Sequence, residues 1–227
     1  MSVAIITGAS RGLGRALAVG LADAGWQVVL DARNPTALAD TQAAIGAAAI
    51  AVPGDVTDPL HQAALFDAAA RLGGPDLLVN NAGILGPSPQ PTLADYPVAV
   101  LRDVYEVNVI APLAMTQLAL RAGVGMIVNV TSDAAVEAYP GWGGYGSAKA
   151  AVEGLSRVLG AEQPNVLVWA VDPGDLRTRM HQEAFPDEDI TDRPLPETVV
   201  PAFLRLVTEQ PASGRISLAE LRSGASA

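Results

Sequence analysis

The chain contains no cysteine, and this absence excludes disulfide bonds, thiolate catalysis and thiolate metal sites. Histidine is scarce too, because His61 and His181 are too few and too far apart in the sequence to suggest a metal site. Basic residues are outnumbered, with 14 Lys and Arg against 24 Asp and Glu and a net charge of −10. Binding to a nucleic acid backbone or to an anionic membrane surface needs the opposite balance. The composition therefore argues against both kinds of partner.

Long hydrophobic runs are also missing. The longest, residues 43–52, ends at Pro53, well short of the ~20 residues that a membrane-spanning helix needs. Residues 1–7 carry no basic segment before their apolar run, so no secretory signal is expected. Because half of the 227 residues are hydrophobic and 17% are charged, we expect one folded domain, residues 1–227, located in the cytoplasm.

Short apolar runs alternate with longer segments of helical periodicity. The runs are continuous, which is typical of strands buried on both faces of a parallel sheet. Strands that alternate with helices predict an α/β protein with a doubly wound parallel sheet, the Rossmann fold, in a single domain. The expected strands are residues 3–7, 28–30, 50–52, 77–79, 126–130, 166–171 and 216–218. The expected helical stripes are Leu13, Leu17 and Leu21; Leu60, Ala64, Leu65, Ala68 and Leu72; and Ala148, Val152, Leu155 and Leu159.

Residues 172–201 form an irregular region with several prolines and the acidic run Asp187-Glu188-Asp189. The region follows the sixth expected strand as a loop or broken helix. In a doubly wound sheet it would emerge at the carboxyl edge of the strands, where ligands bind. A lid over a substrate and a merely solvated loop both fit this pattern.

Glycines at 8, 12 and 14 follow the first expected strand and open a helix. They would let the backbone turn sharply and approach a pyrophosphate, while the helix N-terminus offers free N–H groups and a positive dipole end. Any tight strand-to-helix turn also favours glycine. The position after the first strand nevertheless favours a dinucleotide site.

Tyr145 and Lys149 are four residues apart and would share one face of a helix. A nearby ammonium favours the phenolate and would lower the tyrosine pKa, ordinarily ~10. The phenol could then act as general acid for a carbonyl or as base for an alcohol. Such pairs are also common on exposed helices. Ser132, just past an expected strand, could hydrogen-bond the same carbonyl oxygen, which favours the catalytic interpretation.

Several short motifs follow one another in a specific order. They are TGASRGLG at 7–14, NNAG at 80–83, Asn108, Ser132, Tyr145-x-x-x-Lys149 and Pro173-Gly174. In order and approximate spacing they resemble the short-chain dehydrogenase/reductase superfamily, in its single-domain branch, over nearly the whole chain. The resemblance implies an NADP(H)-dependent oxidoreductase, a carbonyl reductase, that interconverts a small-molecule carbonyl and a secondary alcohol. It also implies a homodimer or homotetramer, commonly formed through the helices after Asn108 and after Lys149.

The resemblance also implies roles for individual residues. Tyr145 would donate or accept the proton, and Lys149 would lower its pKa and bind the nicotinamide ribose. Ser132 would polarise the substrate. Asn108 would order a water of a proton relay, or it could simply hydrogen-bond within a helix kink. The implied cofactor contacts are Gly8, Ser10, Arg11, Gly12, Leu13, Gly14, Arg33, Asp55, Val56, Asn81, Ala82, Gly83, Tyr145, Lys149, Pro173, Gly174 and Thr178. The expected substrate contacts are Leu85, Asp133, Tyr139, Trp142 and Met180.

The end of the second expected strand bears on the choice of cofactor. An acid there selects NAD, because it binds the adenosine ribose hydroxyls and repels a 2′-phosphate. In the family that acid falls where Ala32 stands, and Arg33 follows at a position typical of NADP-dependent members. Arg11 is a second guanidinium suited to a phosphate. NADP(H) is favoured over NAD(H), although Asp31 could pair with Arg33 or face the phosphate site.

Two other functions remain open. One is a regulator that binds a nicotinamide nucleotide without turnover, and the other is an isomerase or dehydratase with a retained cofactor. The complete set of Ser132, Tyr145 and Lys149 argues against the first. Trp142 and Tyr139 could form a wall for a flat or apolar substrate, or could simply pack the loop before the catalytic helix. Nothing in the sequence identifies the substrate.

Overall fold

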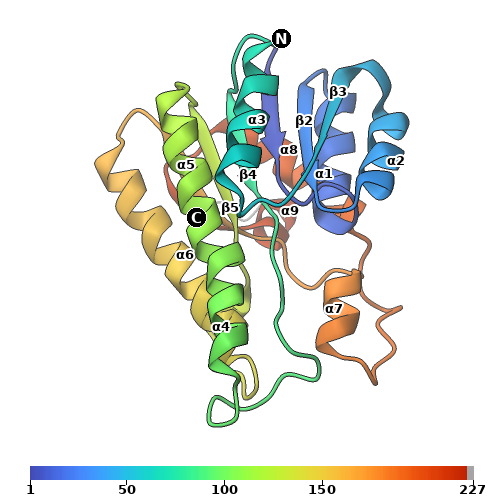
Figure 1. Ribbon diagram of the computed structural model, residues 1–227, viewed down its shortest axis with the longest axis vertical. Coiled ribbons are helices and arrows are strands. Elements are labelled where there is room, and N and C mark those ends of the chain that lie inside the picture. Colours follow the sequence, from blue (N-terminus) through green and yellow to red (C-terminus); the bar gives the residue numbers. More distant parts are fainter. Residues whose placement is uncertain (224–227) are drawn as a thin grey trace.

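A computed structural model describes residues 1–223 and contains a seven-stranded parallel sheet between two layers of helices (Figure 1). The strand order is β3-β2-β1-β4-β5-β6-β7, so the chain winds outward in both directions from the centre. This confirms the doubly wound Rossmann fold that the periodicity predicts. The strands are β1 (Val3–Ile6), β2 (Gln27–Ala32), β3 (Ala49–Pro53), β4 (Leu77–Asn80), β5 (Met126–Val130), β6 (Leu167–Asp172) and β7 (Gly214–Ser217).

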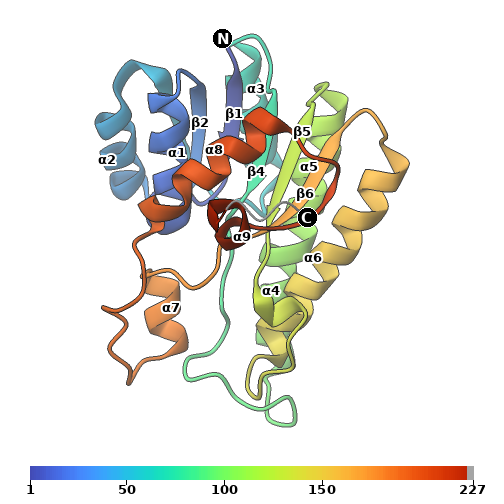
Figure 2. The same cartoon turned by 180° about the vertical axis from the view of Figure 1, so that it is seen from behind.

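Helices cover both faces of this sheet. They are α1 (Gly12–Asp23), α2 (Pro35–Ile45), α3 (Pro59–Ala70), α4 (Val98–Tyr105), α5 (Ala111–Arg121), α6 (Gly143–Glu162), α7 (Arg179–Ala184), α8 (Val200–Glu209) and α9 (Leu218–Ser223). Opposite views show α3, α5 and α6 over one face and α1 and α8 over the other (Figures 1 and 2). In both views α7 lies apart, beyond the carboxyl ends of the strands.

The core consists of two apolar layers, one on each side of the sheet. Leu17 of α1 and Phe203 of α8 are fully buried on one side, and Leu65 of α3 and Met115 of α5 are fully buried on the other. All four residues of β1 are buried, with alternate side chains entering opposite layers. Burial on both faces is the reason that the strands appear in the sequence as continuous apolar runs.

Two residues of the predicted helical stripes are exposed, and for these two the prediction was wrong. Leu60 is 82% exposed because it lies in the first turn of α3, directly after the Asp58 cap. His61 and Leu65 take the inward positions of that helix instead. Leu155 of α6 is 38% exposed. The last strand also ends earlier than predicted, because residue 218 already begins α9.

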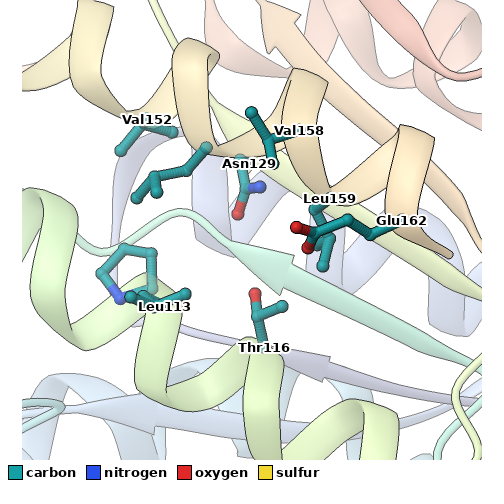
Figure 3. Close-up of a pocket in the computed structure, with 9 residues that line it drawn as sticks. Leu113, Thr116, Asn129, Val152, Val158, Leu159 and Glu162 are labelled. Carbon is teal, nitrogen blue, oxygen red and sulfur yellow. The ribbon is translucent and has the colours of Figure 1, made fainter.

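A small cavity of about 100 Å³ lies between α5 and α6 (Figure 3). Leu155 and Val158 of α6 belong to its mainly apolar lining and remain partly exposed. Thr116 of α5 and Asn129 of β5 supply polar groups to it. This is the pair of helices through which the family resemblance implies self-association, and the oligomeric state remains a prediction.

The irregular region after β6 contains the short helix α7 and a 3-10 turn at Pro196–Val199. The Thr178 hydroxyl caps this helix by accepting a hydrogen bond from the His181 N–H at 3.1 Å. At the carboxyl edge of the sheet, where the sequence predicts a loop or broken helix, the chain thus forms a loop that the short helix α7 interrupts. Among residues 1–223, no helix is both long enough and apolar enough to cross a membrane.

Candidate active site

A cleft of about 1130 Å³ opens at the carboxyl ends of the strands. Its lining comes from the segments that follow β1, β2, β3, β4, β5 and β6, and from the irregular region around α7. Every residue with an implied cofactor contact lines this cleft, and so do Ser132, Leu85, Asp133, Trp142 and Met180. Asn108 and Tyr139 are the two predicted site residues that do not line it. The topology thus brings together side chains that are far apart in the sequence.

The glycine-rich turn forms one wall of the cleft. Gly8 and Gly12 have φ angles of +68° and +55°, in the left-handed region that favours glycine. A Cβ on Gly14 would collide with the Asn81 side chain and the Gly8 carbonyl. The N-terminus of α1 has no side-chain cap, since its N-cap residue, Arg11, makes no capping hydrogen bond. Uncapped N–H groups behind an unobstructed turn fit the phosphates of a dinucleotide.

Thr7 joins this turn to β4. Its hydroxyl accepts hydrogen bonds from Asn81 N at 3.0 Å and Ala82 N at 2.9 Å. The Asn81 side chain in turn donates to the Thr7 carbonyl at 2.8 Å and to the Gly8 carbonyl at 3.2 Å. The structural role of Thr7 was not predicted, because its partners are more than seventy residues away in the chain. The turn is held rigidly between β1 and β4.

Asp31 pairs with His61 and not with Arg33, and it also lines the cofactor end of the cleft. Its Oδ1 lies 2.6 Å from His61 Nε2, and its Oδ2 accepts a hydrogen bond from Gly8 N at 3.3 Å. Both side chains are buried. Arg33 is exposed and has its charge directed to Asp55 instead. Within the described residues, no group of three His, Cys, Asp or Glu side chains could hold a metal ion.

Asp55, which follows β3, lines the cleft together with Asp31 and Arg33. Its Oδ1 accepts hydrogen bonds from Thr57 N at 2.9 Å and from the Thr57 hydroxyl at 2.8 Å. The backbone hydrogen bond from Thr57 lowers the pKa of Asp55, and the charge of Arg33 acts in the same direction, against the effect of burial. Asp55 is therefore a fixed carboxylate beside Arg33.

Tyr145 and Lys149 lie on the buried face of α6, at the other end of the cleft. They are 8% and 4% exposed, and the Lys149 Nζ lies 5.4 Å from the centre of the Tyr145 ring. The ammonium donates a hydrogen bond to the Val130 carbonyl at 2.8 Å. Burial lowers the pKa of Lys149 to about 8. The lysine is thus held under the tyrosine by the end of β5.

The pKa of Tyr145 is raised, whereas the sequence predicts that Lys149 lowers it. Burial is the largest cause, and the negative charges of Asp172 and Asp133 raise the pKa further. The sequence shows the neighbouring lysine but not the depth of burial or the two carboxylates. The phenol consequently keeps its proton at neutral pH, and donation of that proton needs a nearby positive charge to stabilise the phenolate.

Ser132 directs its hydroxyl to the next residue in the chain. Its Oγ donates to Asp133 Oδ1 at 2.9 Å and accepts a hydrogen bond from Ala134 N at 3.2 Å. The Tyr139 hydroxyl donates to Asp133 Oδ2 at 3.1 Å. Both oxygens of Asp133 are therefore engaged. Tyr139, which the sequence predicts as a substrate contact, binds this carboxylate and is not among the residues that line the cleft.

Asn108 lies behind the cleft, in a π-helical turn (Glu106–Ile110) between α4 and α5. It is 1% exposed and pairs with the backbone of Ile84, accepting from its N–H at 2.8 Å and donating to its carbonyl at 2.9 Å. These bonds join the π-helical turn to the segment after β4, and not to other residues of the same helix. Single π-helical turns of this kind are frequent at functional sites.

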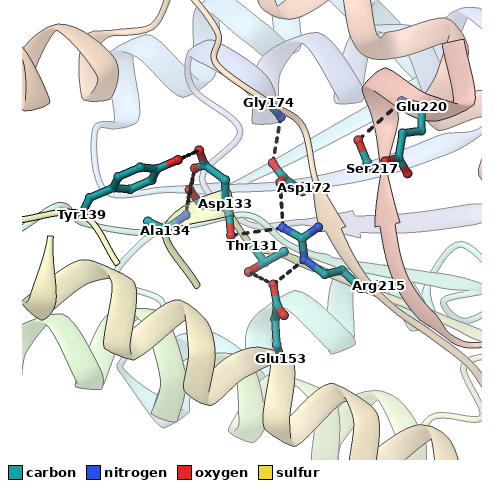
Figure 4. A network of polar contacts seen from close by, with 11 residues as sticks. Thr131, Asp133, Ala134, Tyr139, Glu153, Asp172, Gly174, Arg215, Ser217 and Glu220 are labelled. Atoms are coloured by element: carbon teal, nitrogen blue, oxygen red, sulfur yellow. Dashed lines mark hydrogen bonds and ion pairs between the residues drawn. The ribbon is translucent and has the colours of Figure 1, made fainter. Parts of the chain in front are cut away.

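Arg215 of β7 joins the ends of two other strands to the helix of Tyr145 (Figure 4). Its guanidinium donates to Asp172 Oδ2 at 2.8 Å and to Glu153 Oε1 at 3.0 Å. Thr131 also donates to Glu153, at 2.8 Å. Burial opposes the charged guanidinium, but the hydrogen bond and charge of Glu153 and the charge of Asp172 outweigh it and raise the pKa of Arg215. This network was not predicted from the sequence.

Trp142 lines the cleft next to Tyr145 and packs against two further aromatic rings. The Trp142 ring lies at centroid distances of 6.0 Å from Tyr145, 6.5 Å from Tyr139 and 5.7 Å from Phe185. Phe185 follows α7 directly and was not predicted as a site residue. The irregular region therefore packs against the residue that precedes the catalytic helix.

Comparison with known proteins agrees with this arrangement. A family model described as short chain dehydrogenase matches residues 2–189. A short-chain type dehydrogenase/reductase of Picea abies is 35% identical over 195 residues, which are 78% of this chain and 72% of the relative. A short chain dehydrogenase of Shigella flexneri, solved with NADP, superposes with a TM-score of 0.88 and 27% identity, over 96% of this chain and 97% of its own.

A second solved structure shows the same fold. It is the 3-ketoacyl-(acyl-carrier-protein) reductase of Brucella melitensis, solved with NADH, with a TM-score of 0.86, 27% identity and coverage of 95% of this chain and 96% of its own. The order of the strands, the position of the cleft and these matches all indicate the same family. The chain belongs to the short-chain dehydrogenase/reductase family and is an NAD(P)-dependent oxidoreductase.

Proposed function

We propose that the protein uses NADP(H) to interconvert a small-molecule carbonyl and a secondary alcohol, with Tyr145 as the general acid and base. The observation that carries this proposal is the single cleft that the glycine-rich turn shares with Ser132, Tyr145 and Lys149. One end of the cleft suits a dinucleotide and the other end suits proton transfer. In this proposal residues 1–227 act as one catalytic domain.

The charges at the cofactor end support NADP over NAD. Arg11 and Arg33 line the cleft there, and Ala32 stands where an acid would select NAD. Two guanidinium groups can hold a 2′-phosphate through charge-assisted hydrogen bonds. The Shigella flexneri relative was solved with NADP, whereas the Brucella melitensis relative was solved with NADH. The proposed preference for NADP over NAD therefore rests on Arg11 and Arg33 of this chain.

The proposed mechanism gives each side chain one task. The bound nucleotide supplies the hydride for carbonyl reduction and accepts it in the reverse direction. Tyr145 donates its proton to the carbonyl oxygen, and the Lys149 ammonium stabilises the phenolate that results. Ser132 turns its hydroxyl from Asp133 to the same oxygen and stabilises the developing charge. Asn108, through its bonds to Ile84, shapes the turn behind these groups.

Trp142 and Phe185 support an apolar or flat carbonyl substrate. Both rings lie against the irregular region, and Trp142 lines the cleft next to Tyr145. In this proposal the region around α7 acts as a lid, because Met180 and Leu195 line the same cleft. Leu85 would complete the substrate wall. Both Asp133 oxygens are already engaged, so Asp133 acts on Ser132 rather than on the substrate.

Replacement of Tyr145 tests the proposal. NADPH oxidation would be followed with a panel of ketones and aldehydes, for the wild type and for Tyr145→Phe. Loss of a positioned general acid is expected to reduce kcat by about 10²–10⁴-fold, with NADPH binding retained. Tyr105→Phe, on α4 and outside the cleft lining, is the matched control. Undiminished turnover by Tyr145→Phe would overturn the assignment.

A further inference from the structure

His61 and Asp31 form a buried pair that the proposed mechanism does not use. The two side chains are 8% and 2% exposed, and His61 Nε2 lies 2.6 Å from Asp31 Oδ1. The second carboxylate oxygen accepts a hydrogen bond from Gly8 N at 3.3 Å. Both oxygens of this acid are therefore engaged inside the protein.

The pair lies directly under the cofactor end of the cleft. Asp31 is the next-to-last residue of β2, and with Ala32, Arg33 and Gly54 it lines the cleft. The His61 ring occupies the space beside Gly54, where any Cβ would collide with the ring. His61 of α3 can thus reach the end of β2 because residue 54 is a glycine, which has no Cβ to block the ring.

In the family the acid that selects NAD falls where Ala32 stands, and Asp31 places a carboxylate one residue away, at the end of β2. A free carboxylate there accepts hydrogen bonds from the ribose hydroxyls of NAD and repels a 2′-phosphate. In this chain the carboxylate turns inward to His61 and Gly8, while the Arg33 guanidinium remains exposed on the cleft side. Arg11, Arg15, Arg33 and Asp55 are other charged residues that line this part of the cleft.

We propose that His61 is a specificity-determining residue, which binds the Asp31 carboxylate and thereby withholds it from the adenosine ribose, so that NADP is preferred over NAD. This inference rests on the proposed use of NADP(H). In this inference His61 of α3, which is remote in sequence from the glycine-rich turn, controls the Asp31 carboxylate of β2.

The test measures the dissociation constants of NADPH and NADH by fluorescence, without any substrate. In His61→Leu the carboxylate loses its partner, and the preference for NADPH is expected to fall by about 10-fold or more. His61→Gln keeps a side-chain donor and should retain most of the preference. In the double variant His61→Leu/Asp31→Asn the preference should return, because no carboxylate is released.

Two further variants keep the test decisive. Thr41→Val removes a buried hydrogen-bonding group of α2 outside the cleft lining, and the ratio of the two constants should not change. Should His61→Leu fail to fold by circular dichroism, Asp31→Asn alone decides. The inference expects the ratio of the NADPH and NADH dissociation constants to stay unchanged in this variant, since the carboxylate is already withheld, and a tenfold larger preference for NADPH would overturn it.

The outcomes separate the inference from the proposed function. A wild type that binds neither nucleotide, or binds NADH more tightly, contradicts both. A wild type that prefers NADPH, with the same preference in His61→Leu, contradicts only the role of His61. A fall in preference that Asp31→Asn reverses supports both.

Discussion

The Arg215 guanidinium lies 2.8 Å from Oδ2 of Asp172, one of the two carboxylates whose charge raises the pKa of Tyr145 (Figure 4). Arg215 also pairs with Glu153, which lies on the same helix as Tyr145. A residue of β7 therefore balances a charge beside Tyr145 and ties α6 to the ends of two strands.

Replacing Arg215 by Met should change the pH dependence of catalysis. Without the guanidinium, the charge of Asp172 is unbalanced and the pKa of Tyr145 rises further. Alcohol oxidation needs the phenolate, so its rate should begin to rise at a pH higher by about one unit. Adding Asp172→Asn should restore the wild-type profile. Profiles of kcat against pH for the alcohol reaction provide the measurement.

Arg205→Met is the matched control for this experiment. Arg205 makes an ion pair with Glu209 within α8, far from the cleft lining. Its removal should leave the pH profile unchanged. An unshifted profile in Arg215→Met would mean that the arginine has only a structural role.

Removing Asp133 should release the Ser132 hydroxyl. In Asp133→Ala the hydroxyl no longer has to break its 2.9 Å hydrogen bond before it donates to a carbonyl. An ordinary hydrogen bond contributes about 1 kcal/mol, so kcat/KM for carbonyl reduction should rise by about fivefold. Tyr139→Phe removes the other side-chain partner of Asp133, keeps the bond to Ser132 and serves as the control. A lower kcat/KM in Asp133→Ala would show that the carboxylate positions Ser132 productively.

Lys149→Met should stabilise the fold while it impairs catalysis. The pKa of Lys149 is about 8 in the folded protein and 10.5 as its ordinary value. At pH 7 burial of the ammonium lowers the free energy of unfolding by about 3 kcal/mol. The hydrogen bond from Lys149 to the Val130 carbonyl offsets about 1 kcal/mol of this loss. The free energy of unfolding of Lys149→Met at pH 7 should therefore exceed that of the wild type by about 1–3 kcal/mol.

This difference should depend on pH in one direction. Between pH 8 and 10.5 the unfolded chain holds the lysine proton more tightly than the folded protein does, so the stability of the wild type gains as pH rises. The advantage of Lys149→Met should accordingly shrink across that window. Urea unfolding at pH 7 and at pH 9.5 measures it, and an advantage that grows with pH would contradict the assignment.

Gly14→Ala should disrupt the nucleotide site. Its Cβ would collide with Asn81 and with the backbone of Gly8, and overpacking of this kind costs about 1–3 kcal/mol of stability. NADPH should bind at least about tenfold more weakly. Gly154→Ala in α6 has open space for its methyl group. This control should raise the free energy of unfolding by about 0.5–1 kcal/mol and leave NADPH binding unchanged. Equal dissociation constants for NADPH in both variants would refute the role of this turn.

Much of the fold could be predicted from local sequence patterns. The continuous apolar runs were correct for every strand to within a few residues, because both faces of the sheet are buried and the pattern depends only on neighbouring residues. Errors arose where burial was decided by other elements. Leu60 and Leu155 have the right spacing but face away from the core.

By itself the sequence determined the parallel sheet, the glycine-rich turn and the presence of Ser132, Tyr145 and Lys149, because each of these is encoded by residues close together in the chain. Only the tertiary structure decided the electrostatics around them. Arg215 meets Asp172 across 43 residues and His61 meets Asp31 across 30. Such pairings, and the burial that raises the pKa of Tyr145, depend on which elements pack together, and no local pattern contains that information.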